Sequence, residues 1–141
     1  MKRYLLDFAQ LQNVEVTLTT AQLLALKATP IVLIPAPAAG KAIHLIGGMV
    51  TYNKGTTAFT IANTDENLEL GYDTGTTSVA VVETTGLLDQ AASKSVTIAT
   101  VKDIEVLAAK SLKAANFGTG EWTGAVTSTV KLNLLYNIVT L

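Results

Sequence analysis

The sequence predicts an all-β protein, an antiparallel β-sandwich or jelly roll with one or two short helices. The first observation is composition: threonine occupies 21 of the 141 positions, and valine and isoleucine are also common. These β-branched side chains are stiff at χ1 and pack well on a pleated surface. The second is pattern, because short segments of alternating apolar and polar residues recur between turn residues. Roughly nine short strands separated by turns are typical of such a fold.

The first predicted strand leads directly into a helix. Residues 14–19 alternate apolar and polar side chains, which predicts a strand with one apolar face. Thr19 and Gln22 have the spacing of a capping box, so we expect a helix from Ala21 to Lys27. Pro30 pushes the residue before it toward extended geometry, which ends the helix.

Three further strands are expected in the next part of the chain. Residues 31–34 form an apolar run between two prolines, which fits a strand buried on both faces. Residues 41–52 form a long strand, and the pair Gly47-Gly48 within it indicates a β-bulge or a close approach of another backbone. After a turn, residues 58–62 resume a strand.

The middle of the chain alternates loops with short elements. A polar loop at 63–67 precedes an alternating strand at 68–72 and a buried strand at 79–82. A short helix is expected at 87–92.

The last third contains the one segment with two interpretations. The alanines and lysines of residues 104–115 suit a helix, but we prefer strands at 96–99 and 111–115, because tertiary context often overrides propensity in a sheet protein. Residues 116–124 form a glycine-rich loop. The last strand, residues 130–138, has a clear alternation and one apolar face.

The chain divides into an N-terminal arm, residues 1–13, and a single jelly-roll-like β domain, residues 14–141. A chain of 141 residues is long enough for one core. The arm carries Lys2 and Arg3 beside Tyr4, Leu5 and Phe8, so it combines positive charge with apolar area. That apolar area needs a partner, and the arm either docks on its own domain or reaches onto a neighbouring subunit.

The residues that usually carry catalysis or bind metals are few. The chain has no cysteine, which excludes disulfides and thiolate metal sites. His44 is the sole histidine and lies within a predicted strand, so we expect a structural or surface role. Gly40-Lys41 lacks the other residues of a phosphate-binding loop, and the glycines of 118–124 miss the dinucleotide-binding spacing by one residue. We therefore expect a non-enzymatic protein without a metal or cofactor.

Charge is distributed unevenly along the chain. Residues 55–93 contain no lysine or arginine and six acidic residues, a formal charge of −6: Asp65, Glu66, Glu69, Asp73, Glu83 and Asp89. A calcium site is an alternative, but the EF-hand spacing and its glycine are absent, so we expect a solvated face. Lysines are scattered singly, which argues against nucleic-acid binding, and no segment approaches the roughly 20 apolar residues of a bilayer span.

Residues 14–45 and 116–141 resemble a group of small virion proteins of tailed phages and prophages. The resemblance rests on the Val-Glu-Val-Thr-Leu-Thr strand, the segment from Thr20 to Lys41, and the C-terminal strand that ends Leu-Leu-Tyr-Asn-Ile-Val-Thr-Leu. These residues set helix ends, turns and core strands, and they include no catalytic motif. Residues 55–93 lie outside the resemblance.

The resemblance implies a trimeric jelly-roll capsid decoration (cement) protein. The expected partners are two further copies of the chain and the major capsid protein, and the expected location is the virion, after synthesis in the host cytoplasm. The alternative is a tail-associated or receptor-binding module of a fibre or knob. The interaction residues expected for these roles are Lys2, Arg3, Tyr4, Leu5, Phe8 and Trp122, where Tyr4 and Phe8 are buried anchors and the two cations steer approach.

Overall fold

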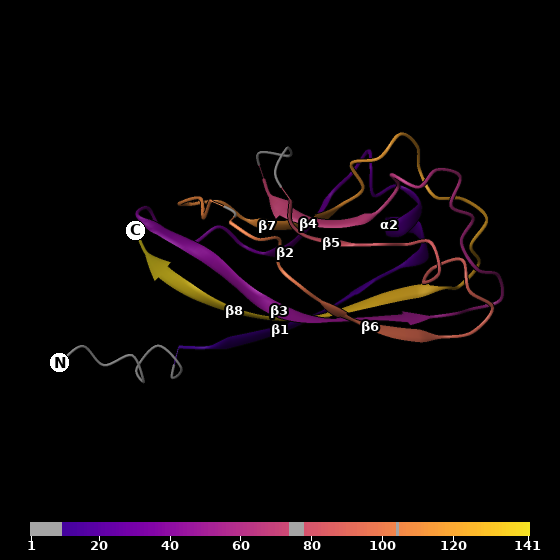
Figure 1. Cartoon of the computed structure of the whole chain (residues 1–141), viewed down its shortest axis with the longest axis horizontal. Helices are drawn as coiled ribbons and strands as arrows, with labels where there is room; N and C mark the ends of the chain where they lie inside the picture. The colour runs from indigo at the N-terminus through magenta and orange to yellow at the C-terminus, as the bar shows by residue number, and fades with distance from the viewer. Residues whose placement is uncertain (1–9, 74–77, 104) are drawn as a thin grey trace.

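A computed structural model of the chain describes residues 10–73, 78–103 and 105–141. Eight strands in this part form two four-stranded antiparallel sheets that face one another (Figure 1). Sheet A has the order β1-β8-β3-β6 and sheet B the order β2-β7-β4-β5. The strands are β1 (Gln12–Leu18), β2 (Ile31–Ile34), β3 (Lys41–Asn53), β4 (Leu68–Tyr72), β5 (Ser78–Val82), β6 (Lys94–Ile98), β7 (Leu112–Ala115) and β8 (Thr129–Thr140).

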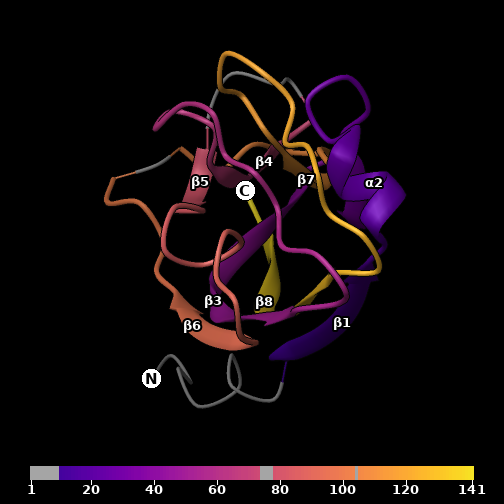
Figure 2. The same ribbon diagram turned by 90° about the vertical axis from the view of Figure 1, so that its right-hand side faces the viewer.

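The strand pairing shows how the chain is wound. The first strand pairs with the eighth, the second with the seventh, the third with the sixth and the fourth with the fifth, all antiparallel. The chain is thus one long antiparallel hairpin rolled into two sheets, and this is the strand order of a jelly roll. Figure 2 shows the two sheets as layers, with loops crossing between them at the end that faces the viewer. The prediction of an antiparallel β-sandwich is confirmed.

The helix α2 (Thr20–Leu24) begins where the sequence predicts it. The Gln22 backbone N–H donates to the Thr19 hydroxyl over 3.3 Å, and the Thr19 N–H donates to the Gln22 side chain over 2.9 Å, which completes the capping box. The helix ends earlier than the expected Lys27. The N–H groups of Lys27 and Ala28 donate instead to the Glu121 carboxylate, over 2.9 and 2.7 Å, so a side chain from a distant loop ends the helix.

Replacing Thr19 with alanine should lower the free energy of unfolding by about 1 kcal/mol, the usual effect of losing an N-cap. The hydroxyl accepts from the Gln22 N–H, and alanine leaves that donor to water. Thr64→Ala is the control, because the Thr64 hydroxyl lies on an exposed loop and makes no recorded hydrogen bond. Urea melts of both variants measure the effect, and equal midpoints would contradict the capping role.

The core fills the space between the two sheets and continues beneath the loops at one end. Its largest fully buried side chains include Trp122 and Tyr52. Phe59 lies between these two rings, with centroids 6.3 Å from Tyr52 and 6.1 Å from Trp122. A loop residue therefore connects strand β3 to the glycine-rich loop through an aromatic cluster.

The expected bulge in the third strand is present. Pairing between β3 and β8 shifts register between Leu45 and Gly47, so Ile46 has no partner on β8. Gly48 lies so close to the Asn133 carbonyl of β8 that a Cβ there would overlap it. The sequence predicted either a bulge or a close approach of another backbone, and the structure has both: a bulge before Gly47 and a close approach at Gly48.

Two short strands that the sequence predicted to be buried each expose one valine. Among the described strands, β2 is an edge strand that pairs only with β7, and Val32 is 50% exposed. Strand β5 is the other edge of sheet B, and Val81 is 45% exposed. An edge strand in an open sandwich has one solvated face, which a wholly apolar run does not reveal.

Two other predicted elements are wrong. Residues 58–62 are not a strand, because only single bridges join Thr57 to Val126 and Thr60 to Thr123. Residues 87–92 are not a helix but a turn, in which the Leu87 and Leu88 N–H groups both donate to the Thr84 carbonyl. By contrast, the preference for strands over a helix in 96–115 is confirmed by β6 and β7.

Candidate functional site

Five of the six predicted interaction residues, Lys2, Arg3, Tyr4, Leu5 and Phe8, lie outside the described residues. The sixth, Trp122, is 1% exposed and belongs to the core. Its indole N–H donates to the Glu66 carbonyl over 2.8 Å, and its ring meets Phe59 edge to face. The structure therefore places this tryptophan where it supports the loop rather than where a partner could touch it.

Glu66 departs from the expected solvated acidic face. Its side chain is fully buried, and its carboxylate accepts from the Ala62 N–H over 3.1 Å and from the Asn63 amide over 2.6 Å. Its backbone carbonyl accepts from Thr84 and Trp122. The expectation of a wholly solvated acidic stretch is thus wrong at this position, because Glu66 joins three loops at one end of the sandwich.

Asp65, next to it, remains at the surface. Its carboxylate accepts a hydrogen bond from the Thr119 hydroxyl over 2.6 Å, and this bond holds the pKa of Asp65 below its ordinary value of 3.8. Within the described residues, no three acidic or histidine side chains gather closely enough to hold a metal ion. The acidic residues at this end of the fold serve to connect loops.

Replacing Thr119 with alanine should raise the pKa of Asp65 toward 3.8, because the charged carboxylate loses its donor. Since the pKa is lowered in the folded state, the stabilisation is present above about pH 3.8 and is lost as the pH falls through the folded pKa. A carboxyl NMR titration of both proteins measures the shift. An identical titration of Asp65 in the two proteins would show that the hydrogen bond does not form in solution.

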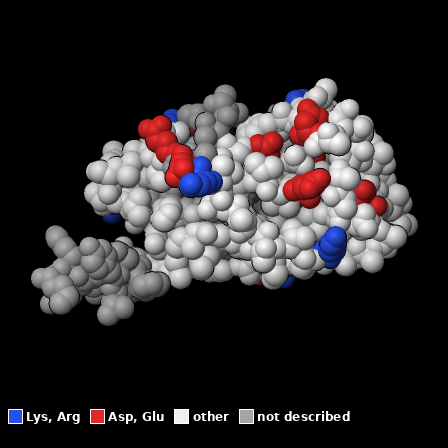
Figure 3. All heavy atoms as spheres, in the orientation of Figure 1, with Lys and Arg blue, Asp and Glu red and all other residues white. Residues whose placement is uncertain are grey.

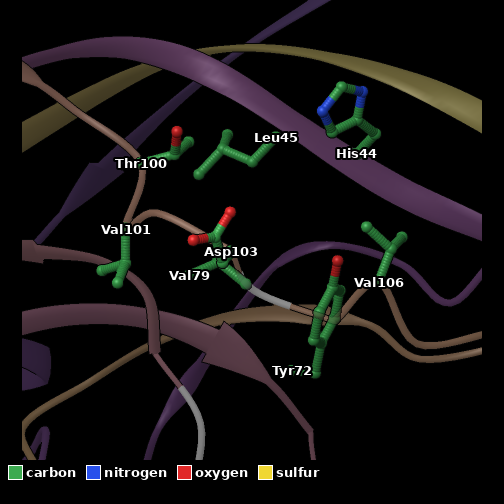
Figure 4. Close-up of a pocket in the computed structure, with 8 residues that line it drawn as sticks. All are labelled: His44, Leu45, Tyr72, Val79, Thr100, Val101, Asp103 and Val106. Atoms are coloured by element: carbon green, nitrogen blue, oxygen red, sulfur yellow. The ribbon is translucent and has the colours of Figure 1, made fainter.

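A hollow of about 200 Å³ opens between the sheets at the opposite end of the sandwich (Figure 4). It is lined by His44, Leu45, Tyr72, Val79, Thr100, Val101, Asp103 and Val106. Figure 4 shows the Tyr72 ring reaching toward β3, where its hydroxyl donates to the Ile43 carbonyl over 2.7 Å. Burial raises the pKa of Tyr72, so its hydroxyl stays protonated as a donor. The polar contact at this hollow therefore ties the two sheets together.

The outer face of sheet A is the broadest feature with the character of a binding surface. We define it by the strand residues that point away from the core: Asn13, Glu15, Thr17, His44, Met49, Thr51, Ser95, Thr97, Lys131, Asn133, Leu135, Asn137 and Val139. Its two formal charges, Glu15 and Lys131, pair with each other at 3.7 Å. In the view of Figure 3, acidic side chains gather over the sheet B half, while the surface along sheet A is largely uncharged.

Sequence reasoning missed two apolar side chains exposed at this surface. Ile46 is 41% and Met49 is 44% exposed, on either side of the two glycines. The signal for Met49 was present, because the bulge before Gly48 shifts the alternation of the strand and turns this residue outward, whereas Ile46 is the unpaired residue of the bulge. His44, on the same face, is exposed, in agreement with the expected surface role.

Comparisons with known proteins show no family for this chain. No protein-family model and no curated protein matches the chain. One similar solved structure is described as the Cyanophage Pam1 capsid asymmetric unit. The match has a TM-score of 0.48 and 15% sequence identity, and it covers 90% of this chain and 82% of that chain. At this TM-score, the similarity carries no argument about function. In the described part of the chain, no helix is long and apolar enough to cross a membrane.

Proposed function

We propose that the protein is a non-enzymatic structural component of a phage virion, a trimeric decoration protein that stabilises the head shell. The observation that carries the proposal is the outer face of sheet A, whose only two formal charges neutralise each other. The sequence resemblance over residues 14–45 and 116–141 supports the same role. The partners would be two further copies of the chain and the major capsid protein.

The outer face of sheet A has the properties of a surface that is buried against another protein. The cores of protein interfaces are depleted of charged residues and often contain methionine, and Met49 lies in the middle of this face between β6 and β8. The asparagine and threonine side chains around it can hydrogen-bond to a partner without the desolvation cost of a charge. A four-stranded sheet offers enough area for an interface of ordinary size.

The arm supplies the second set of contacts in this proposal. Tyr4, Leu5 and Phe8 would bind neighbouring subunits in the particle, and Lys2 and Arg3 would steer the encounter. A receptor-binding module is less well supported, because a sugar-stacking site on the glycine-rich loop would need Trp122, which is buried.

The test is binding to phage heads that were assembled without this protein. Purified wild-type protein should sediment with such heads, and Met49→Lys should reduce the bound amount at least tenfold, since a charge would be buried unpaired at the contact. Val81→Lys is the matched control, because Val81 is exposed to the same degree but lies on sheet B. Equal binding of both variants would exclude the outer face of sheet A.

Labelled electron microscopy of complete particles tests the location itself. A label on this chain should decorate the head. A label confined to the tail or its fibres would overturn the decoration role and favour the receptor-binding alternative.

A further inference from the structure

Strand β8 has a stretch with one unpaired edge. It pairs with β3 along its whole length, Thr129 to Thr140, but with β1 only as far as the pair Gln12 and Tyr136. On the β1 side, residues 137–140 have no strand partner among the described residues. Because the backbone groups of successive strand residues point to alternate sides, two of these four residues direct N–H and C=O groups into the gap. Figure 1 shows β8 and β3 continuing past the start of β1 toward the C-terminus.

A hollow lies at this gap. Its volume is about 480 Å³, and it is lined by Gln10, His44, Asn137, Ile138, Val139 and Thr140. The Asn137 Oδ1 atom is buried and has no hydrogen-bond partner among the described residues. A buried acceptor without a donor is costly, and an unpaired strand edge is a template for another strand. Both features call for an extended segment beside β8.

The residues that lead into β1 do not fill the gap. If β1 continued in register, Leu11 would lie opposite Asn137 and Gln10 opposite Ile138, but neither is paired there, and Gln10 lies in a turn. A β-bulge ordinarily inserts one extra residue before pairing resumes. Among the described residues, pairing on the β1 side of β8 therefore stops at Tyr136, and residues 137–140 are open to a strand from another chain.

The arm has the pattern that such a strand needs. Tyr4, Leu6 and Phe8 alternate with Leu5 and Asp7, so in an extended conformation one face is fully apolar and the other is mixed. If Tyr4 to Phe8 pair with β8 of a neighbour, residues 9–11 link this segment to the start of β1 at Gln12. An extended chain spans about 3.3 Å per residue, so the neighbour's gap must lie within roughly 13 Å of Gln12.

We propose that residues 4–8 of a second copy of this chain pair with β8 at residues 137–140 and fill the hollow. Each copy then gives its arm to one neighbour and accepts the arm of another. Such a head-to-tail contact closes into a ring when the rotation between copies permits it. This proposal deepens the proposed function and rests on it for the number of copies, three.

Disulfide trapping in the full-length protein tests the exchange of arms. Because the chain has no native cysteine, every disulfide that forms must join two introduced cysteines. Val139 points outward on β8, as would Leu5 and Asp7 on the paired arm. Asp7→Cys or Leu5→Cys, each combined with Val139→Cys, should form covalent trimers on oxidation, seen on non-reducing gels. Leu6→Cys with Val139→Cys is the control, because these side chains would lie on opposite faces and should link much less.

Each other outcome overturns the proposal. A disulfide within one chain would show that the arm covers its own sheet, and retention of both thiols would show that the arm does not occupy the hollow. Equal linking of the control pair would exclude a paired strand. The proposed function is judged separately. If the protein sediments as a trimer and binds heads but the cysteine pairs form no disulfide between chains, only the arm exchange is excluded. If covalent trimers form but do not bind heads, only the decoration role is excluded.

Discussion

Replacing Trp122 with alanine should lower the free energy of unfolding by about 3–5 kcal/mol, the range for removing a large buried aromatic side chain. The side chain is 1% exposed, so nearly its whole surface leaves water on folding. The loss has a second component, because the indole N–H satisfies the Glu66 carbonyl and the ring packs edge to face on Phe59. We therefore expect this change to be among the most destabilising single substitutions in the loops.

The control for this prediction comes from the same loop. Phe117 is 37% exposed, and Phe117→Ala should cost much less, since less of its surface leaves water on folding. Urea unfolding of both variants, followed by circular dichroism, gives the comparison. Similar losses in the two variants would mean that the loop is open in solution and that Trp122 is available to a partner after all.

Local patterns predicted the parts of the fold that depend on neighbours in sequence. The capping box at Thr19 and Gln22 involves residues three apart, so its spacing identified the helix start. Alternation over residues 130–138 predicted the long strand β8, and the glycine pair predicted the bulge in β3. In each case, the residues that determine the structure lie within a few positions of each other.

The errors arose where a distant partner decides the structure. Residues 58–62 alternate like a strand, yet only Thr57 and Thr60 find partners, Val126 and Thr123, and single bridges do not extend into a ladder. The polar run around Glu66 predicted solvent exposure, but the distant side chains of Thr84 and Trp122 donate to the Glu66 carbonyl and cover this loop.

The gap beside β8 could not be found from sequence for the same reason. It depends on the difference in length between β8 and β1, and the apolar–polar alternation of each strand does not predict how far the two strands pair. The arm was identified as an apolar segment that needs a partner, but the position that it would fill became visible only with the sheet in place.

Replacing Gly48 with alanine should cost about 3 kcal/mol, at the upper end of the cost of overpacking. Gly48 lies in the middle of sheet A, opposite Leu134 of β8 on one side and Ile98 of β6 on the other. An added Cβ would overlap the Asn133 carbonyl and lie 3.1 Å from the Leu134 Cα, so the atoms that must move are backbone atoms of a central strand. No side chain can rotate away to relieve this contact.

The neighbouring glycine gives the matched control, because the same methyl group is added one residue away. At Gly47 the added Cβ would meet only the Ile98 carbonyl, at 3.2 Å, which a small backbone adjustment relieves. Gly47→Ala should therefore lower the unfolding midpoint only slightly, whereas Gly48→Ala should lower it strongly or prevent soluble expression. If the two variants melt together, β3 and β8 do not approach as closely as the structure places them. The strand pairing that leaves residues 137–140 of β8 unpaired would then need revision.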